Sequence, residues 1–395
     1  PCPKYDPYHR DHWRTPYPAE SAERITELVG HAKANKVKFV WAVHPGVDIK
    51  WIKEDSLNIV RKLESVYEMG VRSFAVFFDD IGGEGAKAEK QAGLLNYITD
   101  EFVKKHDDVE PLIMCPTEYN KSWSGKTYLP TLGRMMYPEV RVMWTGARVI
   151  DMIGEDDTEW IISMLGRKPY IWLNWPVNDY CVDHLLMGRT YGNDLTISDQ
   201  LSGFVSNPME YAEASMLSLY SIADYTWHLS TYDAERSWRQ AIHALLPGHE
   251  AALECFCDHN TDLGPNGHGM RRTEESAALA KAIKSGDTQA VCREVSRMNE
   301  AADELWSLEG HPLIKEIMPW IVTMKSVAMR ASLAIAAKQA VISDNRPAAE
   351  LCIALQTRTT EEQMNILSRN FQGSIKSPNP RPASLVLEPY IKQTM

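Results

Sequence analysis

In the stretch SFAVFFDDIGGEG (residues 73–85), an apolar run ends in two adjacent carboxylates, Asp79 and Asp80, and a glycine-rich turn follows. Successive strand residues point to opposite faces, but this alternation relaxes where a strand becomes a loop. Gly82 and Gly83 permit backbone angles that could turn both carboxyl groups toward one pocket. Two carboxyl groups so close do not both ionise readily, so one should have a raised pKa. A protonated acid beside an ionised one is suited to acid-catalysed cleavage of an acetal.

Other roles for this pair stay open, namely binding of Mg²⁺ or Ca²⁺ and capping of the next helix. The metal alternative is weakened because Glu118 and Asp179 are the only further carboxylates near the other strand ends. Neighbouring residues flank a glycosidic bond poorly, since retaining glycosidases place their carboxyl groups about 5–5.5 Å apart on opposite sides of it. Two neighbouring aspartates are better suited to a reaction in which the substrate's 2-acetamido group is the nucleophile. One aspartate then protonates the leaving oxygen while the other accepts the amide N–H.

Six apolar, strand-like runs alternate with helical segments in the first half of the chain. These runs are apolar throughout, as expected for a parallel sheet that is covered on both faces. In chain order the runs are KVKFVWAVHP (36–45), VRSFAVFFDD (71–80), PLIMCPTEY (111–119), VRVMWTG (140–146), YIWLNWP (170–176) and SGFVSNP (202–208).

Polar side chains stand at the end of nearly every run. A barrel brings the carboxyl ends of all its strands to one mouth, whereas an open sheet spreads them along an edge. The pattern therefore favours an α/β barrel over a doubly wound sheet. The residues concerned are His44, Asp79, Asp80, Glu118, Tyr119, Thr145, Asn174 and Asn207.

The pattern changes after about residue 225, where long helical segments without convincing strands begin. We predict helices at 234–256, 273–285, 287–308 and 311–342. The expected organisation is a barrel domain over residues 1–225 and a helical domain over 226–395, with homo-oligomerisation through the helical domain as one possibility.

Composition narrows the possible functions. The 395 residues are 44% hydrophobic and 24% charged, which is typical of a folded globular protein. The sequence has no run of about 18 apolar residues, so no membrane span is predicted. A formal net charge of −11 argues against nucleic-acid binding, which requires clustered Lys and Arg. Twelve Trp and sixteen Tyr are a weak indication of a sugar site, where aromatic rings face pyranose rings.

The cysteines and histidines predict no metal site. Seven scattered cysteines, an odd number without zinc-type spacing, are interpreted as mostly buried thiols. His44 and the two histidines of the HRDH segment (9–12) are interpreted as structural.

Several ordered motifs resemble glycoside hydrolase family 84, the O-GlcNAcase-type β-N-acetylglucosaminidases, and within it the enzymes of gut Bacteroides. The motifs are PKYDPYH (3–9), WAVHPG (41–46), SFAVFFDDIGGEG (73–85), MCPTEYNKSW (114–123), MWTGARVI (143–150), YIWLNWPVNDY (170–180), YGND (191–194), GFVSNPMEYAE (203–213) and HNTDLGPNGHG (259–269).

The resemblance implies roles for individual residues. Asp80 would be the general acid/base, Asp79 would orient and polarise the acetamido group, and Tyr119 would hold the acetamido oxygen. Contacts with the sugar are implied for Lys4, Trp172, Asn174, Asp179 and Asn207. The implied reaction removes terminal β-linked N-acetylglucosamine (GlcNAc) from a glycan or glycoprotein with retention, through an oxazoline, without metal or cofactor. A secreted or periplasmic bacterial location is also implied.

The resemblance further implies a TIM (β/α)8-type barrel, of which this chain contains six strands. The first two βα units are expected to be absent here, so that the sugar pocket would lack one wall. Two rival functions follow: a GlcNAc-binding barrel without turnover, and an endo-acting enzyme of the hyaluronidase type with the same chemistry.

Overall fold

The computed structural model describes residues 6–261, 276–371 and 379–393. These residues form two compact units. Unit 1 contains the chain up to residue 173 together with residues 196–205, and unit 2 contains residues 174–195 and the chain from residue 206 onward. This division reflects compactness alone, and the domain boundary near residue 225 stays a prediction.

One parallel sheet contains all six predicted strands, which are therefore confirmed. Its strands follow one another in chain order. In register, Ala75 pairs with Ala42 on one side and with Ile113 on the other. A doubly wound sheet reverses its strand order at a switch point, and this sheet does not. The arrangement is that of a partial TIM-type barrel. The strands are β1 (Val40–Val43), β2 (Ser73–Phe77), β3 (Ile113–Cys115), β4 (Arg141–Trp144), β5 (Pro169–Leu173) and β6 (Gly203–Ser206).

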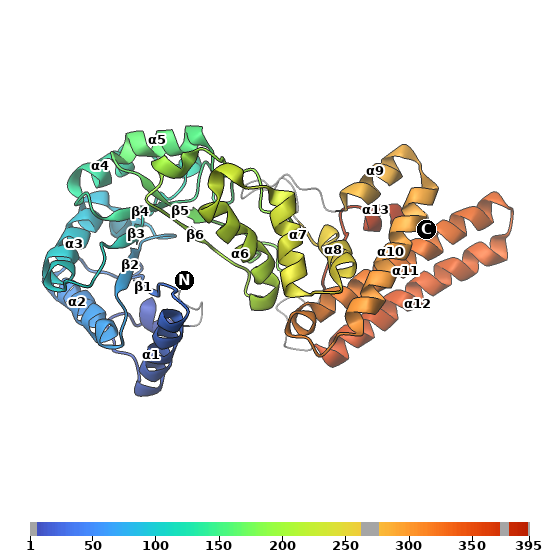
Figure 1. The fold of residues 1–395 in the computed structure, drawn as a ribbon, viewed down its shortest axis with the longest axis horizontal. Helices are drawn as coiled ribbons and strands as arrows, with labels where there is room; N and C mark the ends of the chain where they lie inside the picture. Colours follow the sequence, from blue (N-terminus) through green and yellow to red (C-terminus); the bar gives the residue numbers. More distant parts are fainter. Residues whose placement is uncertain (1–5, 262–275, 372–378, 394–395) are drawn as a thin grey trace. The chain divides into compact units, whose positions relative to one another are not determined.

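Helices cover the outer side of the sheet in unit 1 (Figure 1). On the second of them, Ile59, Leu63 and Val66 are fully buried at the spacing of one helical face. The fifth ends at Gly166, whose φ of 66° is left-handed and terminates the helix. The helices are α1 (Ala19–Ala34), α2 (Lys53–Glu68), α3 (Ala88–Glu101), α4 (Tyr128–Met135) and α5 (Glu155–Leu165).

A core of inward-facing side chains fills the concave side of the sheet. Ala42 of β1, Ala75 of β2, Ile113 and Cys115 of β3 and Met143 of β4 form one buried cluster. Small residues on the first two strands leave room for larger neighbours, as in the layered interior of a barrel.

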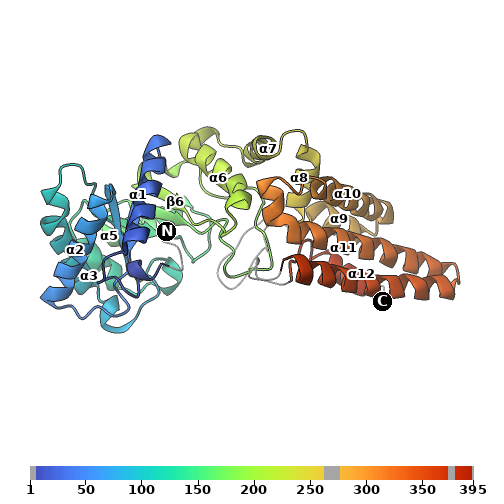
Figure 2. The ribbon, with the colours of Figure 1, turned by 90° about the horizontal axis from the view of Figure 1, so that it is seen from below.

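Unit 2 is dominated by helices, as predicted, and Figure 2 shows the long α11 and α12 side by side. The predicted helix over 234–256 is two helices, because Pro247 and Gly248 (φ 88°) interrupt it. The helices are α6 (Ala212–Trp227), α7 (Ala234–Leu245), α8 (Glu250–Asp258), α9 (Ala277–Ser285), α10 (Thr288–Trp306), α11 (Pro312–Ile342), α12 (Arg346–Asn370) and α13 (Leu387–Lys392).

Among the described residues, α11 alone is long and apolar enough to cross a membrane. Its most apolar window is 61% buried inside the protein, as in a core helix, so this length and composition are weak evidence for a span.

Candidate active site

Two glycines allow the loops after β1 and β2 to touch. A Cβ atom on Gly85 would lie 2.6 Å from the main-chain oxygen of Gly46. A Cβ atom on Gly46 would in turn lie 2.5 Å from the Ile81 side chain. A larger residue at Gly85 would force one of the two loops to move, whereas one at Gly46 would require the Ile81 side chain to shift.

A buried amide on α3 holds the loops after β2 and β3 together. The Gln91 Nε2 atom donates hydrogen bonds to the Gly85 main-chain oxygen (2.8 Å) and to Thr117 Oγ1 (2.9 Å). Thr117 Oγ1 donates to the Phe78 main-chain oxygen at 2.8 Å, and the Tyr128 hydroxyl donates to Gln91 Oε1. Because buried polar groups are costly unless paired, this network fixes the spacing of the two loops.

The two aspartates differ in environment. Asp79 is 22% exposed, and its Oδ1 atom is buried without a hydrogen-bond partner. Asp80 is exposed and has a left-handed backbone with φ of 54°, which aspartate tolerates better than most residues. Gly82 begins the next helical turn, η2 (Gly83–Ala86), with no side-chain cap. The helix-capping interpretation of the pair is therefore wrong.

One member of the pair, Asp79, has the expected raised pKa. Burial raises the pKa of Asp79, the charge of Asp80 raises it further, and the nearby imidazole of His44 lowers it. Asp79 is thus harder to ionise than an ordinary aspartate, whereas the resemblance assigns the ionised role in catalysis to it.

Tyr119, in the loop after β3, belongs both to the core and to the site. Its ring packs in the buried cluster inside the sheet, and its hydroxyl donates a 2.9 Å hydrogen bond to Asp80 Oδ1. Burial and the neighbouring carboxylate raise the pKa of Tyr119, so the hydroxyl stays a donor. The main-chain nitrogen of Thr145 donates to the Tyr119 oxygen at 2.9 Å and anchors this loop to the one after β4.

Trp172 of β5 lies on the inner face of the same unit. It packs against the core cluster, and its ring centroid is 5.6 Å from that of Phe77. Asp79, Asp80, Tyr119 and Trp172 therefore belong to one compact unit, with the three polar groups at the carboxyl ends of adjacent strands.

The remaining predicted sugar contacts belong to unit 2 or lie outside the described residues. Asn174 and Asn207 belong to unit 2, where Asn207 Nδ2 donates to Asn174 Oδ1 at 3.1 Å. The main-chain nitrogen of Val177 donates to the Asn207 oxygen at 2.9 Å. Asp179 is exposed in a turn of the same unit, and Lys4 lies outside the described residues.

Sequence reasoning assigned no site role to His44, which directly follows β1. Its Nε2 atom lies 2.9 Å from the Asp79 main-chain oxygen and 3.6 Å from Asp79 Oδ1. Its place at a strand's carboxyl end was the one sequence signal that could have marked it.

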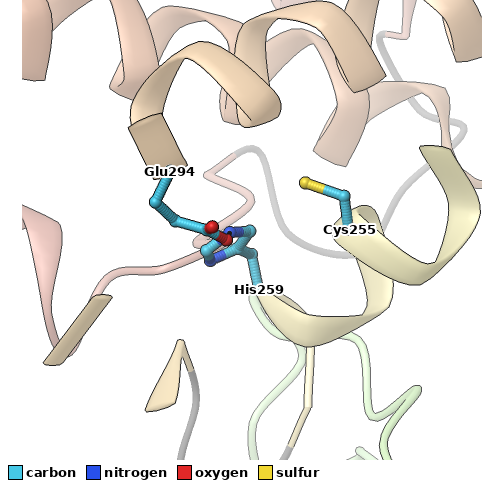
Figure 3. Close-up of side chains that lie close together, drawn as sticks. All are labelled: Cys255, His259 and Glu294. Carbon is cyan, nitrogen blue, oxygen red and sulfur yellow. Dashed lines mark hydrogen bonds and ion pairs between the residues drawn. The ribbon is translucent and has the colours of Figure 1, made fainter. Parts of the chain in front are cut away.

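A group of possible metal ligands occurs in unit 2, although no Cys/His spacing predicted it. Cys255, His259 and Glu294 each offer a ligand atom within 4.8 Å of the others (Figure 3). Within this group, however, His259 already contacts Ser276 Oγ through Nδ1 (2.6 Å) and Glu294 through Nε2 (3.0 Å). Arg297 lies 3.5 Å from the second Glu294 oxygen, and burial raises the pKa of Cys255 to about 12. The polar atoms of His259 and Glu294 thus already have partners within the protein, and the group forms a network of hydrogen bonds and ion pairs.

Comparison with known proteins places these residues in context. The profile of the beta-N-acetylglucosaminidase family matches residues 2–258. The proteins named Protein O-GlcNAcase of Rattus norvegicus and Mus musculus are each 32% identical over 247 residues, which is 60% of this chain. The chain spans only about a quarter of these relatives, because the matched region is 27% of their length.

Solved structures are similar over the whole chain. CpGH84B has a TM-score of 0.86 at 30% identity, covering 100% of this chain and 70% of its own. CpGH84D has a TM-score of 0.87 at 29% identity, covering 100% and 68%. An O-GlcNAc hydrolase mutant of Thermobaculum terrenum has a TM-score of 0.83 at 25% identity, covering 99% and 86%. The family match spans well over half of this chain and includes both aspartates, so the chain belongs to glycoside hydrolase family 84.

Proposed function

We propose that this protein removes terminal β-linked GlcNAc from a glycan or glycoprotein by a retaining, substrate-assisted reaction. The observation that carries the proposal is the asymmetric pair: an exposed Asp80 held by the Tyr119 hydroxyl at 2.9 Å, beside a partly buried Asp79. Family membership supports the same chemistry.

In the proposed first step the acetamido carbonyl oxygen of the sugar attacks the anomeric carbon. The bond from that carbon to the leaving oxygen breaks, and the Asp80 carboxyl group gives its proton to the leaving oxygen. Asp79, which must be ionised at this point although burial raises its pKa, accepts the amide N–H and disperses the positive charge that develops on the oxazoline ring. In the second step Asp80 takes a proton from water, which attacks the anomeric carbon and reopens the ring. Two inversions at that carbon leave the product in the β configuration.

The Tyr119 hydroxyl has two uses in this scheme. Without substrate it donates to Asp80 and fixes that carboxyl group. With substrate bound, we propose that it turns its donor to the acetamido oxygen, which must stay aligned for attack. Trp172 would supply an apolar face to the sugar, and Asn174, Asn207, Asp179 and Lys4 would contact its hydroxyl groups.

We also propose that the six strands belong to an eight-stranded barrel. Their sequential parallel order supports this, as do the similar solved structures, which are longer than this chain. Self-association through the helical region and export from a bacterial cytoplasm stay predictions of the sequence.

The proposal is tested with aryl β-GlcNAc substrates whose leaving groups differ in pKa. Replacement of Asp80 by Asn should slow substrates with poor leaving groups by on the order of 10²-fold or more. Substrates with good leaving groups need no proton for bond cleavage and should be slowed far less. Equal losses for both kinds of substrate would contradict the acid role of Asp80.

The acetamido group is tested separately with the matching aryl glucoside. We expect hydrolysis only where the acetamido group is present, with the β-anomer of GlcNAc as the first product by NMR. Comparable hydrolysis of the glucoside would exclude substrate assistance. Saturable binding of GlcNAc without any release would favour a binding protein, and cleavage inside a hyaluronan chain would favour the endo-acting alternative.

A further inference from the structure

Among the described residues of unit 1, His44 is the one buried histidine whose ring contacts the aspartate pair. The side chain is 3% exposed, and its main-chain nitrogen donates to the His9 oxygen at 2.8 Å. In the sheet, Val43 pairs with Val76, so His44 lies one residue past the end of β1 and beside the chain that leads from β2 to Asp79. The parallel register brings these two residues together.

The contact defines which ring nitrogen carries a proton. Nε2 lies 2.9 Å from the main-chain oxygen of Asp79, and a carbonyl oxygen only accepts hydrogen bonds. His44 therefore donates Nε2–H to this oxygen. The same polar hydrogen lies close to the Asp79 carboxylate, because Nε2 is 3.6 Å from Oδ1. That Oδ1 atom is buried and has no hydrogen-bond partner.

The other groups around Asp79 do not replace this donor. The neighbouring Asp80 raises the pKa of Asp79 instead of lowering it, and the cation Arg10 lowers that pKa less than His44 does. The Cys115 thiol on β3 stays neutral because burial raises its pKa strongly, and the Tyr119 hydroxyl donates its hydrogen bond to Asp80 instead. Among the described groups that face this carboxyl, His44 is thus the near donor.

We propose that His44 is a positioning residue that fixes the Asp79 main chain and favours its ionised carboxylate, so that Asp79 can accept the substrate's amide N–H. The catalytic part of this inference rests on the proposed function. The effect on Asp79 itself does not, and it is measurable without turnover.

The experiment compares His44→Leu, which removes the donor, with His44→Gln, whose amide nitrogen can reach the position of Nε2. Since displacement of a reacting group by about 1 Å can cost on the order of 10²-fold, we expect His44→Leu to lower kcat by roughly 10- to 100-fold. KM should change by less than about threefold, and His44→Gln should recover most of the loss. His106→Gln is the matched control. His106 is a half-buried histidine of the same unit that precedes β3 and pairs with Glu64 of α2, so it has no contact with the aspartate pair.

A double-mutant cycle separates positioning from general damage. If His44 acts through Asp79, then adding His44→Leu to the Asp79→Asn variant should lower kcat by a further factor of less than about three. The acidic limb of kcat/KM should also move to higher pH in His44→Leu, because loss of the donor makes Asp79 harder to ionise. The proposal would be overturned if the kcat losses of the two single variants multiplied in the double variant and the kcat/KM profile of His44→Leu did not shift. If His44→Leu does not fold, His44→Asn serves instead, because its shorter amide does not reach the Asp79 oxygen.

A titration independent of activity distinguishes this inference from the proposed function. The Asp79 carboxyl group can be followed by ¹³C NMR of aspartate-labelled protein and assigned by its disappearance in Asp79→Asn. We expect a higher apparent pKa for this carboxyl in His44→Leu than in the unmodified protein. An unchanged titration overturns the role of His44 even if GlcNAc is released. A shifted titration in a protein that releases no GlcNAc supports the role and contradicts the proposed function instead.

Discussion

At the scale of single residues, unequal environments divide the work between two chemically identical side chains. Asp79 has a buried oxygen without a partner, and Asp80 is exposed and receives the Tyr119 hydroxyl. A folded protein that keeps a poorly solvated carboxylate loses stability whenever that group is ionised. Such a cost indicates a functional position rather than a structural one.

Asp79→Asn should therefore make the protein more stable and less active. Since the pKa of Asp79 is raised in the folded state, its ionisation at neutral pH disfavours folding, and a neutral amide removes that penalty. We expect a gain of roughly 1 kcal/mol at pH 7, which is about 2–4 °C in Tm. The gain should disappear at a pH low enough to protonate Asp79. Thermal unfolding of both proteins at pH 7 and pH 4 checks this, and a variant that is less stable at pH 7 contradicts it.

Tyr119→Phe should impair catalysis without large structural damage. The ring can still fill its place in the core, while the 2.9 Å hydrogen bond to Asp80 is lost. We expect kcat to fall by about 10- to 100-fold, a magnitude that corresponds to one strong hydrogen bond to a charged group. Steady-state kinetics test this, with circular dichroism as the check on folding. A loss confined to KM would place Tyr119 in binding alone.

At the scale of elements, close backbone approach sets the geometry of the site. The loops after β1 and β2 touch where Gly46 and Gly85 have no side chains, and Gln91 on α3 ties the second loop to the one after β3. The loop of the carboxylates is thus held by a close main-chain approach on one side and by the Gln91 side chain on the other.

Gly85→Ala should displace the loop of the aspartates. Its new methyl group would lie 2.6 Å from the Gly46 oxygen, so one of the two loops must move. We expect a destabilisation of about 1–3 kcal/mol and a loss in kcat of at least tenfold. The matched control is Gly93→Ala in α3, where no atom lies within 4 Å of the added methyl group. That change should stabilise the protein by about 0.5–1 kcal/mol. Urea denaturation and kcat of both variants test the pair, and equal behaviour would refute the steric argument.

The elements that the sequence could predict are those with a strong local signal. Each of the six strands lies in a mainly apolar run, and the aspartate pair and Tyr119 stand at the ends of two of these runs. Four described helices, α1, α4, α12 and α13, lie outside the predicted helical segments, and the sequence signals of the first two are weak. α1 buries no side chain and so has no apolar stripe, and α4 has eight residues that include Pro130. His44 was among the strand-end residues expected at the mouth but was interpreted as structural, because the register of β1 with β2 that brings it to Asp79 is not visible in the sequence.

At the scale of the whole molecule, the two units contain buried ionisable groups whose responses to acid differ in sign. In unit 1, protonation of Asp79 favours the folded state. In unit 2, burial and the charge of Arg381 lower the pKa of His184 to about 4, from a usual value of 6.5. Because the folded state resists protonation of His184, acid favours the unfolded chain of that unit.

His184 should thus make unit 2 sensitive to mild acid. Its contribution to stability is complete above pH 6.5, where the imidazole is neutral in both states, and is lost as the pH falls from 6.5 toward 4. The loss amounts to roughly 3 kcal/mol, from a shift of about 2.5 pKa units. His184→Gln cannot titrate, so its free energy of unfolding should decline less steeply over this interval even if the variant is weaker at pH 7. His228→Gln, at a histidine whose side chain is 66% exposed, should keep the slope of the unmodified protein. Urea denaturation at several pH values measures these slopes. Parallel slopes for all three proteins would mean that His184 is protonated equally well in the folded and unfolded chains, so that its burial would not affect the acid stability of unit 2.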